Sequence, residues 1–310
     1  MADNDNDAQA WLDEADACHD ADPARAAGLL RRLSPAALPA DRLPSLAFLL
    51  NHVLGEKLGA WGEANAMFAP LLGAAGAAAP VVLWRQAAAA AGLAGDAAAA
   101  SRHTDQLARA SGASVEQAHD VVALTRAMYR VPGLAAVAAA DAVAEALPAL
   151  ELPRWQDGVT PLDAAVAACT NNIASGLIER PPQDLAHASL RSATERTAQL
   201  AERFWLRAGN WVHHERAAYL RALVANGLGD AAQGREHALS ALALLDANDN
   251  EHAEQVDRAF ILLEQARACR LLGSVDEAQA ALAAADALAA QFGDPGLEPW
   301  YAERRAASVG

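Results

Sequence analysis

Apolar and polar residues alternate along most of the chain with the period of an α-helix. The clearest stretch carries apolar residues at steps of three or four positions, namely Leu162, Val166, Cys169, Ile173 and Leu177. At 3.6 residues per turn these side chains share one face, so the stretch predicts a helix that buries that face. Pro181 and Pro182 end this helix, because proline lacks a backbone N–H and its ring clashes with the preceding turn. We expect a second helix to follow and to pack back on the first through Ala186 and Leu190.

The same pattern predicts helices joined by short loops along the rest of the chain. Including the second helix of this hairpin, they cover residues 8–20, 23–33, 44–58, 61–73, 80–94, 96–111, 114–130, 134–147, 183–208, 210–228, 230–246, 250–272, 275–292 and 297–307. Residues 1–7 are expected to be a frayed acidic tail, and Ser114 with Gln117 resembles a capping box. The longest irregular stretch, 148–161, contains three prolines. It predicts a joint between an N-terminal half, 1–147, and a C-terminal half, 162–310, of one continuous stack.

Residues 160–193 resemble a tetratricopeptide repeat, especially the kind with paired asparagines in kinesin-light-chain-like proteins. The match is carried by the sequence NNIA at 171–174 and by Ala186 as the small residue of the second helix. A regular array steps by about 34 residues. The resemblance implies an all-α fold, a right-handed α–α superhelix of about seven hairpins with a C-terminal capping helix. Similar segments align, at irregular steps of 36 to 49 residues by subtraction, on Ala26, Ala64, Ala100, Val137, Gly234 and Ala278.

Composition supports a helical stack. Alanine dominates the 53% of hydrophobic residues, while aromatic residues make up 5%. Alanine is the best helix former and allows helices to approach closely. At 310 residues the chain is longer than one compact core usually serves. Hairpins that contact only their neighbours have no such limit.

The net charge of −15 limits the partners that we expect. Basic residues are almost all arginine, and Lys57 is the only lysine. An acidic field disfavours nucleic acid and anionic membranes, so we expect neither as a partner. The three cysteines, Cys18, Cys169 and Cys269, are expected to be buried thiols in a reducing compartment. With an acidic start and no long apolar segment, the chain is expected to be cytoplasmic, and its oligomeric state stays open.

The sequence offers little evidence of catalytic chemistry. Neither a phosphate-binding GxxxxGK[ST] loop nor GxSxG nor HExxH occurs. His213 and His214 suggest a metal site together with Glu215, but adjacent histidines point about 100° apart on a helix. A pair on the helix surface explains them better, so we expect no metal and no cofactor.

The resemblance also points to a recognition surface. In tetratricopeptide repeats the first helix of each hairpin lines the concave side, which implies that Asn171, Asn172 and Ser175 lie near a ligand. An asparagine amide both donates and accepts, which suits the backbone of an extended peptide; the alternative is that these amides bond within the stack. Clustered arginines would pair with an acidic ligand or, alternatively, form a solvated face. The candidate peptide-binding residues are Asn171, Asn172, Ser175, Arg216, Tyr219, Asn226, Arg267 and Arg270.

These features predict a scaffold that binds a protein or peptide, with acidic ligands favoured, on the concave face of the stack. One alternative is a peptide-sensing regulator of the helical-repeat type without its own DNA-binding domain, because no N-terminal helix-turn-helix is recognisable. Another is an enzyme with its site in the groove. Clustered His, Glu or Asp around a deep pocket near Trp211 would favour the enzyme, whereas an open groove without perturbed titratable groups would favour the scaffold.

Overall fold

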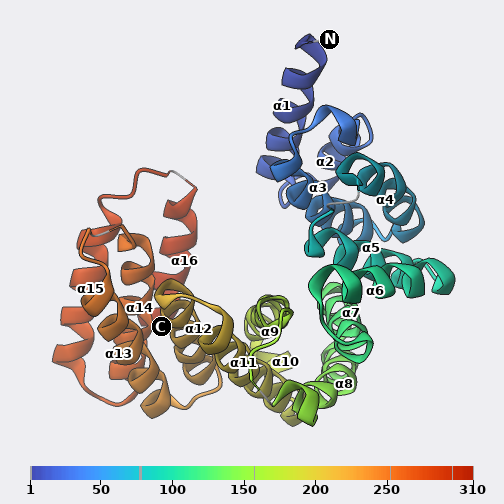
Figure 1. The fold of residues 1–310 in the computed structure, drawn as a ribbon. Helices are drawn as coiled ribbons and strands as arrows, with labels where there is room; N and C mark the ends of the chain where they lie inside the picture. The colour runs from blue at the N-terminus through green and yellow to red at the C-terminus, as the bar shows by residue number, and fades with distance from the viewer. Residues whose placement is uncertain (1, 77–78, 157, 252, 295, 310) are drawn as a thin grey trace. The chain divides into compact units, whose positions relative to one another are not determined.

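The computed structural model of the chain consists of helices joined by short turns (Figure 1). It describes residues 2–76, 79–156, 158–251, 253–294 and 296–309. Within these ranges no residue belongs to a β-strand, which confirms the predicted all-α class. Contacts divide the chain into two compact units, Met1–Ala165 and Val166–Gly310, which we call unit 1 and unit 2. None of the helices in the described ranges is long and apolar enough to span a membrane.

Unit 1 contains the helices up to α8, and α9 crosses into unit 2. The helices of unit 1 are α1 (Ala2–Cys18), α2 (Pro23–Leu30), α3 (Leu43–Leu49), the π-helix η3 (Leu50–Lys57), α4 (Trp61–Ala75), α5 (Val81–Leu93), α6 (Ala97–Ser111), α7 (Val115–Arg130) and α8 (Ala136–Ala146). Its 3-10 turns are η1 (Pro35–Ala37), η2 (Ala40–Arg42), η5 (Val131–Gly133), η6 (Pro148–Glu151) and η7 (Pro153–Trp155). The remaining helices are α9 (Asp163–Ile178), α10 (Pro182–Leu185), α11 (Ala188–Ala208), α12 (Trp211–Gly227), α13 (Ala231–Asn248), α14 (Gln255–Leu271), α15 (Val275–Ala289) and α16 (Leu297–Val309).

Helices in both units pack in sequential pairs. In unit 1, α1 packs on α2 and α5 on α6; in unit 2, α12 packs on α13 and α14 on α15 (Figure 1). Helices two apart also touch, as α5 does with α7, α12 with α14, and α14 with α16. Contacts between such near neighbours are consistent with a helical repeat.

The buried apolar residues form clusters that join neighbouring helices. In unit 1 one apolar cluster extends from α1 to α5 and includes Leu12, Leu46 and Phe68. In unit 2 several smaller clusters each join neighbouring helices. One of them packs Ile178 of α9 against α11 and α12, and a Cβ at Gly227 of α12 would collide with the Ile178 side chain. Small residues thus allow the helices to approach closely.

A recurring turn links the two helices of three pairs. Gly95, Gly229 and Gly273 have φ of 82°, 85° and 80°, in the left-handed region that glycine adopts without steric cost. The N–H of the following residue donates to a carbonyl five positions back, at 2.8 to 2.9 Å. The same turn therefore ends one helix and starts the next. The residues that follow the glycines, and that serve as N-caps, are Asp96, Asp230 and Ser274.

The small residue predicted on the second helix of a pair often lies four positions after the N-cap of that helix. Ala100 occupies this position in α6 and is half-buried. The prediction of Val137 is wrong, because its side chain is 48% exposed. The residue four positions after the N-cap Ala135 is Ala139, which is fully buried. Four of the predicted residues are buried at this position, namely Ala26, Ala64, Gly234 and Ala278.

The prediction of Ala186 as a packing residue is also wrong, because the helix predicted over 183–208 is interrupted. α10 ends at Leu185, α11 begins at Ala188, and Ala186 between them is exposed. Most side chains of residues 181–189 are exposed, so no apolar face holds this stretch in a continuous helix.

The ends of most other predicted helices agree with the structure to within a few residues. The helix predicted over 250–272 begins only at Gln255, and position 252 of that prediction lies outside the described residues. A second error lies at the N-terminus. Residues 2–7 belong to α1 and do not form a separate tail. The capping box is confirmed: Ser114 and Gln117 exchange side-chain and backbone hydrogen bonds at the start of α7.

Residues 148–156 form two 3-10 turns that are fixed to α7. Trp155 is fully buried, and its indole Nε1 donates to Oδ2 of Asp120 at 2.8 Å. Arg154 binds both oxygens of the same carboxylate, at 2.6 and 2.9 Å. These contacts belong to unit 1, and position 157 of the predicted joint lies outside the described residues.

Candidate functional site

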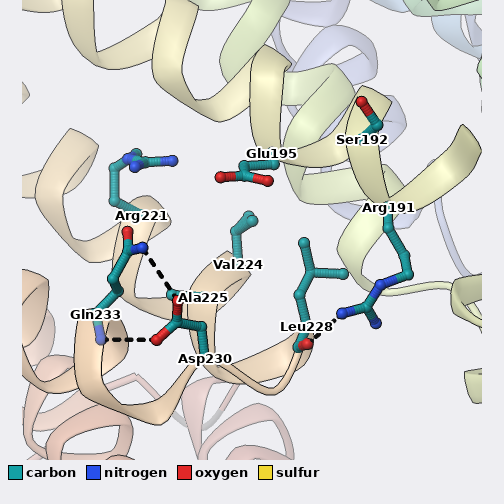
Figure 2. Close-up of a pocket in the computed structure, with 9 residues that line it drawn as sticks. All are labelled: Arg191, Ser192, Glu195, Arg221, Val224, Ala225, Leu228, Asp230 and Gln233. Atoms are coloured by element: carbon teal, nitrogen blue, oxygen red, sulfur yellow. Dashed lines mark hydrogen bonds between the residues drawn. The ribbon is translucent and has the colours of Figure 1, made fainter. Parts of the chain in front are cut away.

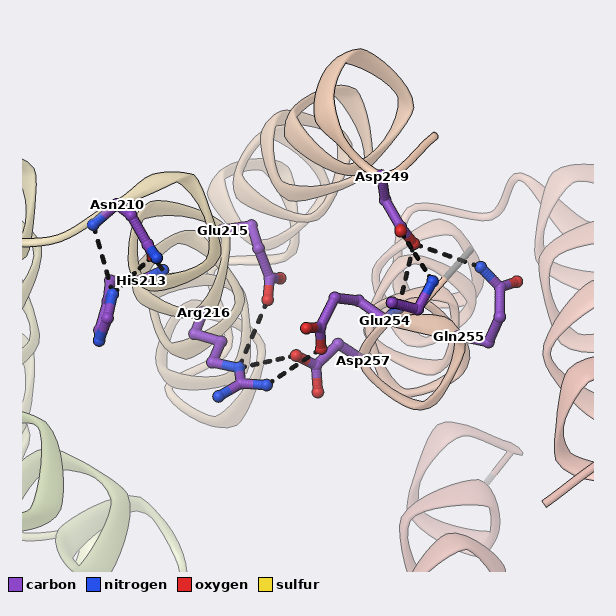
Figure 3. Close-up of polar contacts among 9 residues, drawn as sticks. Asn210, His213, Glu215, Arg216, Asp249, Glu254, Gln255 and Asp257 are labelled. Atoms are coloured by element: carbon purple, nitrogen blue, oxygen red, sulfur yellow. Dashed lines mark hydrogen bonds and ion pairs between the residues drawn. The ribbon is translucent and has the colours of Figure 1, made fainter. Parts of the chain in front are cut away.

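The start of α12 is built around Asn210 and His213. Oδ1 of Asn210 accepts from the backbone N–H of His213 at 3.2 Å, and the backbone N–H of Asn210 donates to Nδ1 of His213 at 3.3 Å (Figure 3). The imidazole also lies over Trp205, with ring centroids 4.4 Å apart. His213 therefore has a structural role at the beginning of the helix.

Arg216, a predicted site residue, joins α12 to the start of α14. Its Nε lies 2.7 Å from Oδ2 of Asp257 and its Nη2 lies 3.1 Å from Oε2 of Glu254 (Figure 3). Asp249 holds the turn before α14, because its oxygens accept from the backbone N–H groups of Ala253 at 2.8 Å and Glu254 at 3.1 Å. Arg216 therefore pairs with two carboxylates, those of Glu254 and Asp257, and Asp249 stabilises the turn that precedes them.

Glu215 is buried next to this group. Its side chain is fully buried, and neither carboxylate oxygen has a hydrogen-bond partner. Nε of Arg216 lies 3.6 Å from its Oε1, which is a long distance for an ion pair. Burial, followed by the Asp257 carboxylate, raises the pKa of Glu215, and Arg216 opposes this effect only in part. We therefore expect the Glu215 carboxyl to be protonated near neutral pH.

Asn226 and Arg270 of the predicted set connect helices inside unit 2, whereas Arg267 contacts Glu264 on its own helix, α14. Nδ2 of Asn226 donates to the backbone oxygen and to Oε2 of Glu264, both at 2.9 Å. Burial raises the pKa of Glu264, while Asn226 and Arg267 oppose this effect. Nη1 of Arg267 lies 4.0 Å from Oε2 of Glu264. Nε of Arg270 donates to the backbone oxygen of Ser308 at 3.0 Å, which ties α14 to α16.

The other predicted residues lie on α9 and α12. On α9, Asn171 and Ser175 are half-buried and Asn172 is exposed. Tyr219 of α12 is half-buried and packs against apolar clusters that involve α13, α14 and α16, and burial raises the pKa of its hydroxyl. The structure thus brings the predicted residues of α12 and α14 onto adjacent helices and places the paired asparagines on α9.

A cavity of about 280 Å³ lies where the first part of α11, the end of α12 and the start of α13 meet (Figure 2). Arg191 and Ser192 of α11 line one side, and Arg221 and Val224 of α12 line another, with Gln233 from α13. None of these residues is among those predicted from the sequence. Figure 2 shows the guanidinium groups of Arg191 and Arg221 on opposite sides of the cavity.

Arg221 is the least satisfied of these charged groups. It is 8% exposed, and its Nε has no hydrogen-bond partner. That Nε lies 3.4 Å from Oε2 of Glu202, which forms an ion pair with it. A buried guanidinium whose Nε forms no hydrogen bond favours a further partner that accepts hydrogen bonds.

The remaining charged groups of the cavity have partners. Asp230 caps α13, because its oxygens accept from the backbone N–H of Gln233 at 3.1 Å and from its Nε2 at 3.0 Å. Nη2 of Arg191 donates to the backbone oxygen of Leu228 at the end of α12. Glu195 is exposed at the rim and accepts from its neighbour Gln199 at 3.3 Å. Among the described residues that line the cavity, the buried side-chain atom without a hydrogen-bond partner is Nε of Arg221, which is a donor.

The sequence does contain a signal for Arg221. This residue interrupts the apolar run LRALV at 220–224, where every residue is buried. Burial of a charged side chain costs free energy because the group loses its hydration. A charged residue inside a buried apolar run is therefore a candidate for a specific role.

Comparison with known proteins does not assign the chain to a family: no family model matches the sequence, and no curated protein matches it at a significant level. The fold itself is all-helical, with helices packed in sequential pairs.

Proposed function

We propose that the chain is a helical-repeat scaffold of the tetratricopeptide-like type that binds a protein or peptide through unit 2. The sequential pairing of helices and the glycine turn that recurs at Gly95, Gly229 and Gly273 support a repeat. The irregular length of the repeated segments agrees with a degenerate array.

The observation that carries this proposal is the buried, incompletely bonded Arg221 in the cavity between α11, α12 and α13. Cavities that bind small molecules usually measure about 300–1,000 Å³. At about 280 Å³ this cavity suits one side chain better than a whole cofactor or metabolite. An arginine donates two parallel hydrogen bonds to a carboxylate, so the preferred occupant is an acidic side chain of a bound peptide.

An array of peptides that vary in the number of Asp and Glu residues tests this proposal. We expect the full chain to bind acidic peptides, and added salt to weaken this binding through screening. Arg221→Gln should reduce the affinity about tenfold or more, since a charge-assisted hydrogen bond contributes about 1.5–3 kcal/mol. Circular dichroism shows whether the variant is folded.

Arg235→Gln is the matched control for Arg221→Gln. Arg235 also lies in unit 2, on α13, but pairs with Glu277 at 2.6 Å and does not line the cavity. Its substitution should leave peptide affinity unchanged. Equal affinities for acidic and neutral peptides, or a folded Arg221→Gln variant that binds like wild type, would contradict the proposal.

A second candidate function is catalysis at Glu215. Its buried carboxyl with a raised pKa, next to Asp257 and Arg216, is the kind of group that general acids require. Glu215, however, does not line the cavity between α11, α12 and α13. Binding of acidic peptides that is lost in Arg221→Gln and kept in Glu215→Gln would favour the scaffold.

A further inference from the structure

We propose that His19, Asp20 and His52 of unit 1 form a binding site for a divalent transition-metal ion. His19 and Asp20 follow directly after α1, and His52 lies in the π-helix η3. One ligand atom of each residue, an imidazole nitrogen or a carboxylate oxygen, lies within 4.8 Å of the other two. π-Helical segments occur frequently at functional sites, because they displace side chains from the positions of a regular helix.

The distances fit the ligand shell of a metal ion. Nε2 of His19 lies 3.4 Å from Oδ2 of Asp20, and Nε2 of His52 lies 3.6 Å from Oδ1 of the same carboxylate. Zinc binds such ligands at 2.0–2.2 Å, so neighbouring ligand atoms of a tetrahedral ion are about 3.3–3.6 Å apart. The two nitrogens and the carboxylate therefore need little movement to share one ion.

Hydrogen bonds orient both imidazole rings toward Asp20. Nδ1 of His19 faces the backbone oxygen of Asp16, and Nδ1 of His52 lies 3.0 Å from Oε2 of Glu56. Both oxygens are acceptors, so Nδ1 is the donor of each ring and Nε2 is the nitrogen that can bind an ion. A cation placed between the three side chains would contact both Nε2 atoms and the carboxylate. A second oxygen on the far side of each ring is the arrangement that supports metal-bound histidine in proteins.

The ring of His52 is also held by packing. Phe48 stacks on it, with ring centroids 5.2 Å apart and an interplanar angle of 11°. The side chain of His52 is 14% exposed and that of Asp20 is 71% exposed. The site is therefore rigid on its protein side and open to ions from solution.

Lys57 competes with the ion for Asp20. Its Nζ lies 2.9 Å from Oδ1, the oxygen that also faces His52. The i→i+5 hydrogen bonding of a π-helix brings residues four and five positions apart onto one side, and so places Glu56 and Lys57 near His52. Lys57, the only lysine of the chain, thus pairs with Asp20 when no metal is bound, and an ion that binds has to displace the Lys57 ammonium group.

The ligand set indicates the class of ion. Imidazole nitrogen suits zinc, nickel, cobalt and copper, whereas magnesium and calcium prefer shells made entirely of oxygen. With protein ligands from His19, Asp20 and His52, water would complete the coordination. We therefore assign the site to a zinc-like ion.

The test is titration of the tag-free full chain, stripped of metal, with ZnCl2 in a calorimeter. We expect one Zn²⁺ per chain, and binding at least tenfold weaker in His52→Ala and in Asp20→Asn. MgCl2 should give no comparable heat. His187→Ala, which removes an exposed histidine of unit 2, should bind like wild type.

Lys57→Met provides a readout that a merely structural cluster would not show. Removal of the competing ammonium should tighten zinc binding, even if His52→Ala proves too unstable to titrate. Absence of zinc binding up to about 1 mM, unchanged affinity in a folded His52→Ala variant, or unchanged or weaker affinity in Lys57→Met would overturn the assignment.

Discussion

Asn226 and Glu264 form a doubled contact between the first helices of two successive pairs: Nδ2 of Asn226 lies 2.9 Å from the backbone oxygen and 2.9 Å from Oε2 of Glu264. The same arrangement recurs in unit 1. There Nδ2 of Asn51 lies 3.0 Å from the backbone oxygen and 2.8 Å from Oε1 of Gln86. By subtraction, Gln86 and Glu264 each precede the glycine of their turn, Gly95 or Gly273, by nine residues. The two units therefore use one polar device to join successive helix pairs.

Asn226→Ala should lower the free energy of unfolding by about 1–3 kcal/mol, because it removes the donor from buried acceptors of Glu264. Urea denaturation measures the change. Asn248→Ala is the control, since this amide is exposed and bonds only to Leu244 of its own helix. A loss of the same size in both variants would mean that the contact with Glu264 adds no stability.

Gly234→Ala tests how closely α13 approaches this contact. A Cβ at Gly234 would overlap Oδ1 of Asn226, so the substitution should destabilise the chain by about 1–3 kcal/mol despite the better helix propensity of alanine. Gly176→Ala in α9 should instead add about 0.5–1 kcal/mol, since no atom lies within 4 Å of the new methyl group. Thermal unfolding of both variants compares the signs, and a stabilised Gly234→Ala would contradict the close approach.

The positions of most helices could be predicted from the sequence because local signals determine them. Apolar residues at helical spacing, together with prolines and with turns such as Gly95-Asp96, give the boundaries without knowledge of tertiary contacts. The break at Ala186 could not be predicted, because residues 183–208 read as one helix from composition alone. What distinguishes 181–189 is the lack of a partner to pack against, which only the folded unit shows.

Ala139→Leu and Ala186→Leu form a pair that tests the corrected positions. Ala139 is fully buried, so the larger side chain should overpack α8 and cost about 1–3 kcal/mol. Ala186 is exposed between α10 and α11, so the same substitution should change stability by less than about 0.5 kcal/mol. Chemical denaturation measures the free energy of unfolding of both variants. A larger loss of stability in Ala186→Leu than in Ala139→Leu would show that Ala186 lies at a close helix contact, as the resemblance implies.

The candidate sites were harder to predict than the fold. Asn226 and Arg270 carry the residue types expected of a binding surface, yet in the structure they join helices to each other. His19 and His52 are far apart in the sequence and form no recognisable motif, and the π-helix that brings them together has no pattern of its own. Arg221 alone had a local signal, the charge within an apolar run.

The pH dependence of stability should report on Glu215. The pKa of its carboxyl rises from 4.5 to about 9 on folding, chiefly through burial, with Asp257 and Glu254 adding to the rise and Arg216 opposing it. Between these two values the folded chain binds more protons at this residue than the unfolded chain does. The stabilisation is therefore complete below about pH 4.5 and is lost as the pH rises toward 9.

Glu215→Gln isolates this effect, because glutamine resembles the protonated carboxyl and cannot ionise. The melting temperature of the wild type should fall between pH 5 and pH 9, and the variant should lose less over the same range. Glu303→Gln, at an exposed position of α16, should keep the slope of the wild type. Burial of Glu264 also raises the pKa of that residue and contributes a slope of the same sign, so the comparison rests on the difference between variants. Parallel curves for wild type and Glu215→Gln would show that Glu215 is ionised in the folded chain, with Arg216 compensating its charge.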